Sequence, residues 1–292
     1  MLKIALITNF NISEKANAAM QVADRLLKNN CEILIAAFNR EKIMRMHKNR
    51  DMFRYLPIET VYAEADILIV LGGDGSILEA ARRAAQRGTP ILGINLGRLG
   101  YMAELELQEL DLLDSLFTKE YTIEERSMLR VELFGAGGEM RSFCHALNDA
   151  VISNGSMPHM IDLELFESGE SVTTYRADGL IVATPTGSTA YSMSAGGAII
   201  DPRTNCVCVT PICPHSFVAR PLIFSDSSVL EIRNICVREK RLYLTVDGRM
   251  NFEFYHNQTV RITKSPMKTN LIRFKKCGFF RKLRQKMNDS RA

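Results

Sequence analysis

The sequence predicts an α/β protein with an added all-β part: an N-terminal parallel-sheet α/β domain followed by a C-terminal β-sandwich. In the first third of the chain, apolar segments alternate with amphipathic ones, which is typical of parallel strands covered by helices on both faces. From about Leu129 onward, short strands separated by glycine-containing turns replace this pattern. The 292 residues suffice for two domains, which we place at 1–124 and 125–268.

Hydrophobic periodicity defines the elements of the first domain. We expect strands at Ile4–Thr8, Glu32–Phe38, Ile67–Leu71 and Pro90–Asn95, and helices at Ser13–Asn30, Ile77–Arg87 and Leu107–Phe117. Residues 40–60 are charged and rich in Met and Arg, and they match neither the helical nor the strand period. The first residues are too short for a signal peptide and favour a buried strand.

Alternation and turn residues define the second domain. Two hairpins are expected, Leu129–Phe134 with Arg141–Ile152 and Ile161–Phe166 with Ser171–Arg176. Further strands are expected at Val207–Thr210, Val229–Ile235, Arg241–Val246 and Thr259–Ser265. Residues 269–292 contain a last strand, Leu271–Phe274, and a helix, which we expect to pack back on the N-terminal domain.

The charge balance favours a small anionic ligand over nucleic acid. A net charge of +4 is mild, and the clustered basic residues, Lys275, Lys276, Arg281, Lys282, Arg284 and Lys286, all lie near the C-terminus. They alternate with apolar residues at helical spacing, which suits either a membrane-surface helix or a docked terminal helix. We favour the docked helix. No apolar run approaches the roughly 20 residues of a membrane span.

The cysteines indicate a reducing compartment. Seven cysteines without regular spacing favour free thiols, and therefore a cytoplasmic protein. The exception is the group Cys206, Cys208, Cys213 and His215, which includes metal-ligand residue types. It lacks the usual Cys-x-x-Cys knuckle, so we favour free thiols over structural zinc and expect no metal ligand set.

The most informative motif is the glycine turn Gly72–Gly75, which connects the strand Ile67–Leu71 to a helix. Such a turn lets backbone approach a ligand closely, and the helix N-terminus offers N–H groups to a phosphate. Together with Gly97–Tyr101, it falls at the carboxyl ends of strands, where parallel sheets bind ligands. Asp74 in the turn either caps the helix or manages a proton or a metal beside the phosphates.

A second dense patch, Asp178–Gly197, contains a carboxylate, a tyrosine, glycines and hydroxyl residues. Its exposed amides and hydroxyls suit ribose and pyrophosphate oxygens, and Tyr191 offers a ring for stacking on a base. The alternative is a tight turn that needs small residues for steric reasons. Neither a P-loop, nor the dinucleotide fingerprint G-x-G-x-x-G, nor a G-x-S-x-G elbow occurs in the chain.

With these motifs the chain resembles the NAD kinases, which phosphorylate the adenosine ribose 2′-hydroxyl of NAD to give NADP. The resemblance covers nearly the whole length and rests on Gly72–Gly75, Asn95–Tyr101, Asn148–Asp149, Asp178–Gly197 and Thr210–His215. It implies an active site in the cleft between an α/β domain and a β-sandwich. It also implies ATP or a related phosphoryl donor accompanied by Mg²⁺, and a homodimer or homotetramer.

The resemblance also assigns roles to residues of this sequence. Asp74 is the implied catalytic carboxylate, which accepts the proton of the ribose hydroxyl. The implied substrate and nucleotide contacts are Gly72, Gly73, Gly75, Tyr101, Asn148, Asp149, His159, Arg176, Asp178, Thr186, Thr189, Ala190, Tyr191, Ser194 and Arg249. Tyr101 is an aromatic wall near the adenine or a core residue.

The residues are also compatible with two other functions. A lipid kinase of the diacylglycerol or sphingosine type shares the glycine-aspartate turn, but it needs an apolar substrate pocket, whereas the second patch is polar. A non-catalytic NAD(P)-binding regulator would bind the dinucleotide without turnover, and the intact Asp74 argues against it.

Overall fold

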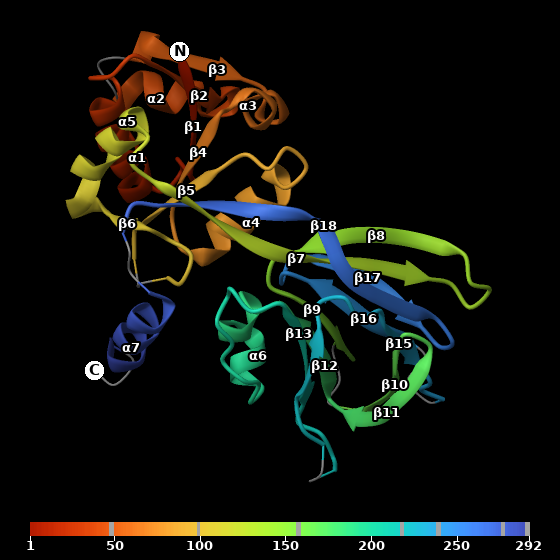
Figure 1. Ribbon diagram of the computed structural model, residues 1–292. Helices are drawn as coiled ribbons and strands as arrows, with labels where there is room; N and C mark the ends of the chain where they lie inside the picture. The colour runs from red at the N-terminus through yellow and green to blue at the C-terminus, as the bar shows by residue number, and fades with distance from the viewer. Residues whose placement is uncertain are drawn as a thin grey trace. The chain divides into compact units, whose positions relative to one another are not determined.

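The computed structural model describes residues 1–46, 50–97, 100–155, 159–216, 219–237, 241–275 and 278–289 (Figure 1). The chain divides into two compact units. Unit 1 contains residues 1–125 and 269–292, and unit 2 contains residues 126–268. Strands β7 (Thr122–Phe134) and β18 (Thr259–Arg273) each contribute residues to both units.

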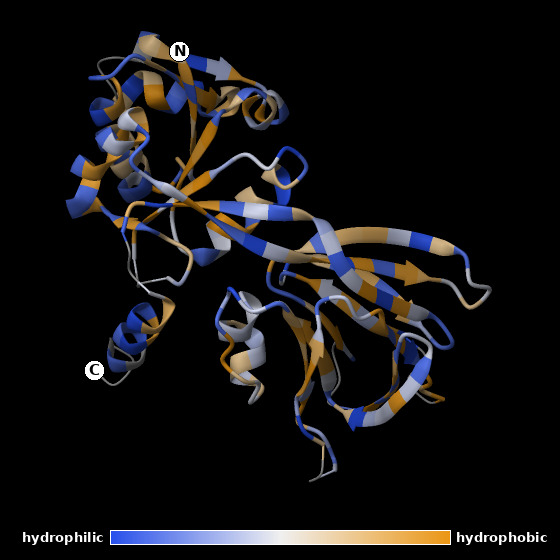
Figure 2. Cartoon of the chain, viewed as in Figure 1, coloured by the Kyte–Doolittle hydropathy of each residue, from blue (hydrophilic) through white to orange (hydrophobic). Residues whose placement is uncertain are grey.

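Unit 1 is built on the predicted parallel sheet, in the order β3-β2-β1-β4-β5, with the end of β18 beside β5. Its strands are β1 (Leu2–Ile7), β2 (Cys31–Ala36), β3 (Phe53–Leu56), β4 (Ile67–Leu71), β5 (Ile91–Asn95) and β6 (Leu105–Glu106). Ile4 and Ala5 point to opposite faces of β1, and both are fully buried, so both faces of the sheet are covered. Figure 2 shows the central strands in the orange of hydrophobic residues.

The helices of unit 1 include α1 (Ser13–Leu26), α2 (Arg40–Met46), α3 (Ile58–Glu64) and α4 (Asp74–Ala84). Short 3₁₀ turns occur at Ala37–Asn39 (η1) and Arg50–Met52 (η2). Residues 40–60, which matched neither period, contain α2, β3 and the start of α3. Each of these elements is short, and that is why no periodicity is visible in the sequence.

The helix predicted at roughly Leu107–Phe117 is present, but most of it is a 3₁₀ helix instead of a regular α-helix. The segment forms the 3₁₀ element η3 (Leu107–Asp114) and a short helix α5 (Ser115–Thr118). Glu106 and Glu109 form a reciprocal capping box, and Glu109 has non-helical backbone angles (φ −112°, ψ 19°), which breaks the regular helix. Leu113 and Leu116 are buried, as the apolar pattern predicts.

Unit 2 contains two sheets. The first has the strands β11 (Glu170–Ala177), β10 (Ile161–Glu167), β15 (Leu230–Asn234), β18, β7 and β8 (Met140–Ala146). The second has the order β14 (Leu222–Ser225), β13 (Cys206–Ile212), β12 (Gly179–Ala183), β9 (Asp149–Ser153), β16 (Arg241–Val246) and β17 (Met250–Tyr255), all antiparallel. One cluster of buried side chains combines Leu163 and Ile232 of the first sheet with Leu180 and Leu244 of the second. The predicted antiparallel β domain is thus confirmed.

The strand predicted at Arg141–Ile152 is interrupted. Residues Met140–Ala146 form β8 in the first sheet, whereas Asp149–Ser153 form β9 in the second. At the break, the backbone N–H groups of Leu147 and Asn148 donate to the carboxylate of Asp247. The break therefore has a specific partner, which lies far along the chain.

The chain ends in helix α7 (Phe279–Asp289), as its spacing predicted, and α7 belongs to unit 1. Two small helical turns in unit 2, η4 (Gly187–Thr189) and α6 (Tyr191–Ser194), complete the fold. None of the described helices is long and apolar enough to cross a membrane.

Candidate functional site

The glycine turn of unit 1 follows the fully buried strand β4 and leads directly into helix α4. Gly72 has φ +155°, and a Cβ there would overlap the side chain of Ser76. Gly73 is the N-cap residue of α4; it is exposed, and a Cβ there would meet nothing within 4 Å among the described residues. The turn therefore leaves open space at the N-terminus of α4, where N–H groups attract anions.

Asp74 does not cap its own helix, so the capping interpretation is wrong. No side-chain cap bond is found at the start of α4 in the described part of the chain. Both carboxylate oxygens instead accept backbone N–H groups from a neighbouring loop, that of Tyr101 at 2.9 Å and that of Met102 at 3.1 Å. A Cβ on Gly100 would overlap this carboxylate, so glycine is needed there for the loop to approach. Asp74 is half-buried and held at two points.

A second group of predicted residues lies at one end of the second sheet of unit 2. Asp149 begins β9 and Asn148 precedes it. The antiparallel register pairs Asp149 with Ala183, the last residue of β12, and the N–H of the next residue, Thr184, donates to Asn148 O at 2.8 Å. The Thr184 hydroxyl donates to Leu147 O at 2.6 Å and accepts the N–H of Gly187 at 3.1 Å. A Cβ on Gly187 would overlap the backbone of Asn148, so the two segments are in direct contact.

Asp247 holds this end of the sheet together, and its role was missed from the sequence. Its carboxylate accepts the N–H groups of Leu147 at 2.9 Å, Asn148 at 2.8 Å and Asp149 at 3.1 Å. Its own N–H donates to Asp149 O at 3.0 Å. The only signal was its place in the Asp-Gly turn that follows β16, where Asp247 has φ +49°.

The carboxyl groups of Asp149 and Asp247 share this buried region. Burial, and next the charge of Asp247, raise the pKa of Asp149 from 3.8 to about 7. Burial also raises the pKa of Asp247, against the lowering effect of its three backbone hydrogen bonds. Between pH 3.8 and about 7, the native state therefore keeps a proton on Asp149 that the unfolded chain has already released.

The free energy of unfolding is accordingly expected to fall as pH rises through this window, because the unfolded state binds fewer protons there. Asp149→Asn, which cannot ionise, should flatten this dependence and stabilise the protein at pH 8 by about 1–3 kcal/mol. Urea unfolding at pH 5 and pH 8 measures both effects. Equal slopes of stability against pH in the variant and the wild type would contradict the assignment.

The hydroxyl-rich patch is partly structural. Ser188, Ser192 and Thr184 are buried and bonded inside the fold; for example, Ser188 Oγ donates to Pro185 O at 2.7 Å. Thr186 is also buried and accepts from Arg126 at 3.2 Å. By contrast, Tyr191, with 47% exposure, and Ser194 are exposed on α6. The steric interpretation thus holds for the buried hydroxyls, whereas Tyr191 is available to a ligand.

Three other predicted residues lie away from this group: Asp178 at the opposite end of the second sheet, His159 after β9, and Arg176 on β11 of the first sheet. Asp178 precedes β12, and its N–H donates to Ile212 O at 2.9 Å. Arg176 is exposed at the end of β11, and His159 is exposed beyond the end of β9. With a rise of about 3.3 Å per residue, Asp178 and Thr184 are about 20 Å apart. Arg249 is exposed in the turn after Asp247, next to the first group.

The remaining predicted contacts belong to these same elements. Gly75 is exposed in the first turn of α4, and Tyr101 is half-buried beside Asp74. Burial, and next the charge of Asp74, raise the pKa of Tyr101. Thr189 and Ala190 are half-buried between η4 and α6, and the Thr189 hydroxyl donates to Thr186 O at 3.2 Å.

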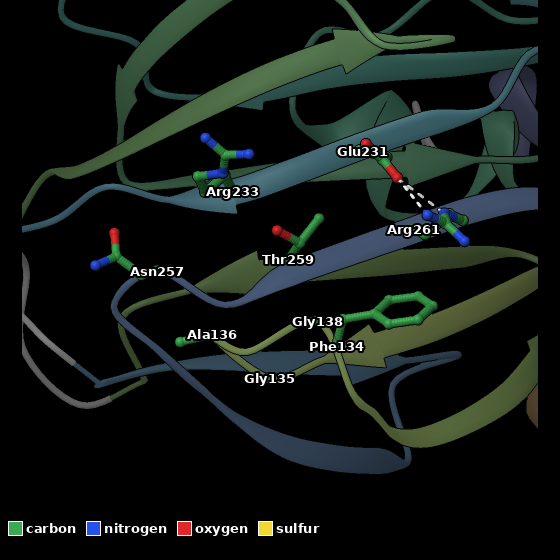
Figure 3. Close-up of a pocket in the computed structure, with 9 residues that line it drawn as sticks. All are labelled: Phe134, Gly135, Ala136, Gly138, Glu231, Arg233, Asn257, Thr259 and Arg261. Atoms are coloured by element: carbon green, nitrogen blue, oxygen red, sulfur yellow. Dashed lines mark hydrogen bonds and ion pairs between the residues drawn. The ribbon is translucent and has the colours of Figure 1, made fainter.

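A cavity of about 480 Å³ in unit 2 is separate from these groups (Figure 3). It lies beside the turn Gly135–Gly138, and Glu231 and Arg261 on its wall form an ion pair at 2.8 Å. No predicted site residue lines this cavity. We therefore assign it no part in binding or catalysis.

The cysteine group does not form a metal site in the described residues, where no three His, Cys, Asp or Glu side chains lie close enough to hold an ion. Cys206 and Cys208 are buried free thiols of β13, and Cys213 is an exposed free thiol.

Two family models match the chain. The family model described as the ATP-NAD kinase N-terminal domain matches residues 4–121. The model described as the ATP-NAD kinase C-terminal domain matches residues 147–274. Together they cover most of the chain, including the glycine turn and the group around Asn148.

Individual relatives point the same way. The chain is 42% identical over 225 residues to the NAD kinase of Geotalea daltonii, covering 77% of this chain and 78% of that one. It is 37% identical over 290 residues to the NAD kinase of Thermoanaerobacter sp. (strain X514), covering 99% of this chain and 100% of that one.

Solved structures extend the match to the whole fold. Yeast NADH kinase complexed with NADH has a TM-score of 0.92 at 25% identity, covering 100% of this chain and 89% of that chain. An NAD kinase from Archaeoglobus fulgidus in complex with ATP has a TM-score of 0.74 at 25% identity, covering 98% of each chain. Since the family models and full-length relatives agree with the fold, the chain belongs to the NAD kinase family.

Proposed function

We propose that this protein transfers the terminal phosphoryl group of ATP to the adenosine ribose 2′-hydroxyl of NAD, giving NADP, and that Asp74 accepts the hydroxyl proton. The observation that carries the proposal is the turn of unit 1. It places a carboxylate, fixed by the N–H groups of Tyr101 and Met102, in the first turn of a helix whose N-cap is open.

The chemistry requires little more than positioning and charge. A phosphoryl group passes through a loose transition state, so the protein mainly aligns the reactants and offsets charge. A ribose hydroxyl is a poor nucleophile at neutral pH, and a carboxylate within about 3 Å can take its proton as the new bond forms. The N–H groups near Gly72, Gly73 and Gly75 suit the donor phosphates.

NAD binding is proposed for the exposed and half-buried residues of unit 2. Asn148 and Asp149 would hold ribose hydroxyls, with Thr186, Thr189 and Ala190 beside them. Tyr191, Ser194 and Arg249 would contact the same half of the ligand. His159, Arg176 and Asp178 would contact the other half of the ligand. Asp178 is about 20 Å from Thr184 along β12, which suits the far end of an extended dinucleotide.

ATP is expected to bring Mg²⁺ with it as part of the substrate. The triphosphate would supply most of the metal ligands, as is usual for Mg²⁺. We further propose a cytoplasmic homodimer or homotetramer.

The direct test is NADP formation by the purified protein with ATP and Mg²⁺. Labelled ATP supplied with a mixture of NAD and a sphingoid base distinguishes the NAD kinase from the lipid kinase. Label in NADP alone supports the proposal, whereas label in the lipid contradicts it. Tight NAD binding without product would instead identify a regulator. Repeating the assay with NADH, other triphosphates and polyphosphate defines the substrate range.

Tyr191→Ala is expected to raise KM for NAD with a smaller change in kcat. The exposed ring contributes stacking that is equal in the ground state and the transition state, and loss of such uniform binding changes KM. A loss of about 1–3 kcal/mol, typical of one base–aromatic contact, corresponds to a rise of roughly 5- to 150-fold. Tyr191→Phe, which keeps the ring, is the control. An unchanged KM in the alanine variant would show that the ring only packs.

A further inference from the structure

The loop Tyr101–Glu104 lies between Asp74 and the C-terminal segment of the chain, and it is bonded to both. On one side the N–H groups of Tyr101 and Met102 donate to the Asp74 carboxylate. On the other side the carbonyl groups of Met102 and Ala103 accept hydrogen bonds from cationic side chains. Arg273 Nη1 donates to Met102 O at 2.8 Å, and Lys282 Nζ donates to Ala103 O at 2.7 Å.

Glu104 ties this loop to the C-terminal segment. Its side chain is only 2% exposed. One oxygen accepts the backbone N–H groups of Phe274 at 3.1 Å and Lys275 at 2.9 Å. The other oxygen lies 3.2 Å from Arg273 Nη1 and 3.5 Å from Lys282 Nζ. A buried carboxylate with this many donors fixes its neighbours, because leaving any of the charges unpaired is costly.

Helix α7 adds a second contact to the same loop. The rings of Tyr101 and Phe279 lie 6.2 Å apart, and Lys286 Nζ lies 3.9 Å from the centre of the Tyr101 ring. The basic face of α7 is thus partly directed at the loop rather than only at solvent. Lys282, with 14% exposure, and Arg273, with 10%, are largely buried there.

We propose that Lys282 of α7, with Glu104 and Arg273, is a positioning residue for Asp74. It acts through the backbone of the loop Tyr101–Glu104, in which the N–H groups of Tyr101 and Met102 orient the Asp74 carboxylate. The inference rests on the proposed role of Asp74 as proton acceptor, and it gives the basic C-terminal helix a part in catalysis that needs no contact with substrate.

The test compares two variants of the same helix. Lys282→Met keeps the aliphatic stem and removes the ammonium group, whereas Arg284→Met does the same at an exposed position. Lys282→Met is expected to lower kcat by about 10- to 100-fold with KM for NAD unchanged, since misplacement of a catalytic group by about 1 Å can cost about 10²-fold. Arg284→Met should retain the wild-type kcat. Lys282→Arg, which can donate to the same oxygens, should restore most of it.

A double-mutant cycle with Asp74→Asn shows whether Lys282 acts through Asp74. If it does, adding Lys282→Met to Asp74→Asn lowers kcat no further. Two results would overturn the positioning role while leaving the proposed function intact. One is a double variant whose fold-loss in kcat equals the product of the two single losses. The other is a wild-type kcat in Lys282→Met with an unchanged thermal midpoint. Normal turnover of Asp74→Asn alone would instead overturn the proton-acceptor role, and the positioning role with it.

Discussion

Replacing Asp74 by Asn is expected to lower kcat at least about 10²-fold while NAD still binds, because a general base contributes about 10²–10⁴-fold. The asparagine side chain has nearly the same shape, but its amide cannot accept the proton of the ribose hydroxyl. It also cannot accept both N–H groups of Tyr101 and Met102, so one hydrogen bond is lost. Steady-state kinetics with NAD and ATP, together with NAD titration by calorimetry, measure the two effects separately.

Asp66→Asn provides the matched control for this experiment. Asp66 also belongs to unit 1 and accepts a backbone N–H, that of Lys3 at 2.9 Å, but it precedes β4 instead of following it. The control should keep the wild-type kcat. A fall in kcat of the same size in both variants would point to general damage, and near-normal turnover of Asp74→Asn would remove Asp74 from the chemistry.

Asp247→Ala is expected to produce the largest loss of stability, on the order of 3 kcal/mol. It leaves three backbone N–H groups, those of Leu147, Asn148 and Asp149, without their acceptor. Each unsatisfied buried donor costs about 1–3 kcal/mol, and relief of the repulsion with Asp149 offsets part of the sum. Because these N–H groups fix the start of β9, KM for NAD should rise as well. Urea unfolding at pH 7 and NAD kinetics measure the change.

A surface carboxylate of the same sheet is the comparison. Glu253 on β17 is about half exposed, with a 3.5 Å ion pair to Arg241. Exposed pairs of this kind contribute about 0–1 kcal/mol, so Glu253→Ala should change stability little. If Asp247→Ala were no more destabilising than Glu253→Ala, Asp247 would not be the group that holds Asn148 and Asp149 in place.

The parts of the fold that could be predicted are those with long, regular patterns. Strands such as Ile67–Leu71 and helices such as the one that begins at Ser13 follow from apolar periodicity, and the glycine turn after β4 was recognised from local residue types. The elements of residues 40–60 could not be assigned, because each is too short to show a period. The helix at Leu107–Phe117 was located, but its 3₁₀ form and the non-helical angles of Glu109 are not visible in apolar periodicity.

In the candidate site, too, the local features could be predicted from the sequence and the long-range contacts could not. Local residue types placed Asp74 in a turn that precedes a helix. Asn148 and Asp149 were identified by the family resemblance, and the strand expected there is interrupted just before Asp149. The partners that orient them come from distant segments: Asp247 is 99 residues from Asn148, and Phe274 is 170 residues from Glu104. Periodicity reports only which face of an element is apolar. Which carboxylate meets which backbone N–H depends on the register of strands brought together by folding, and it was therefore settled only in the three-dimensional structure.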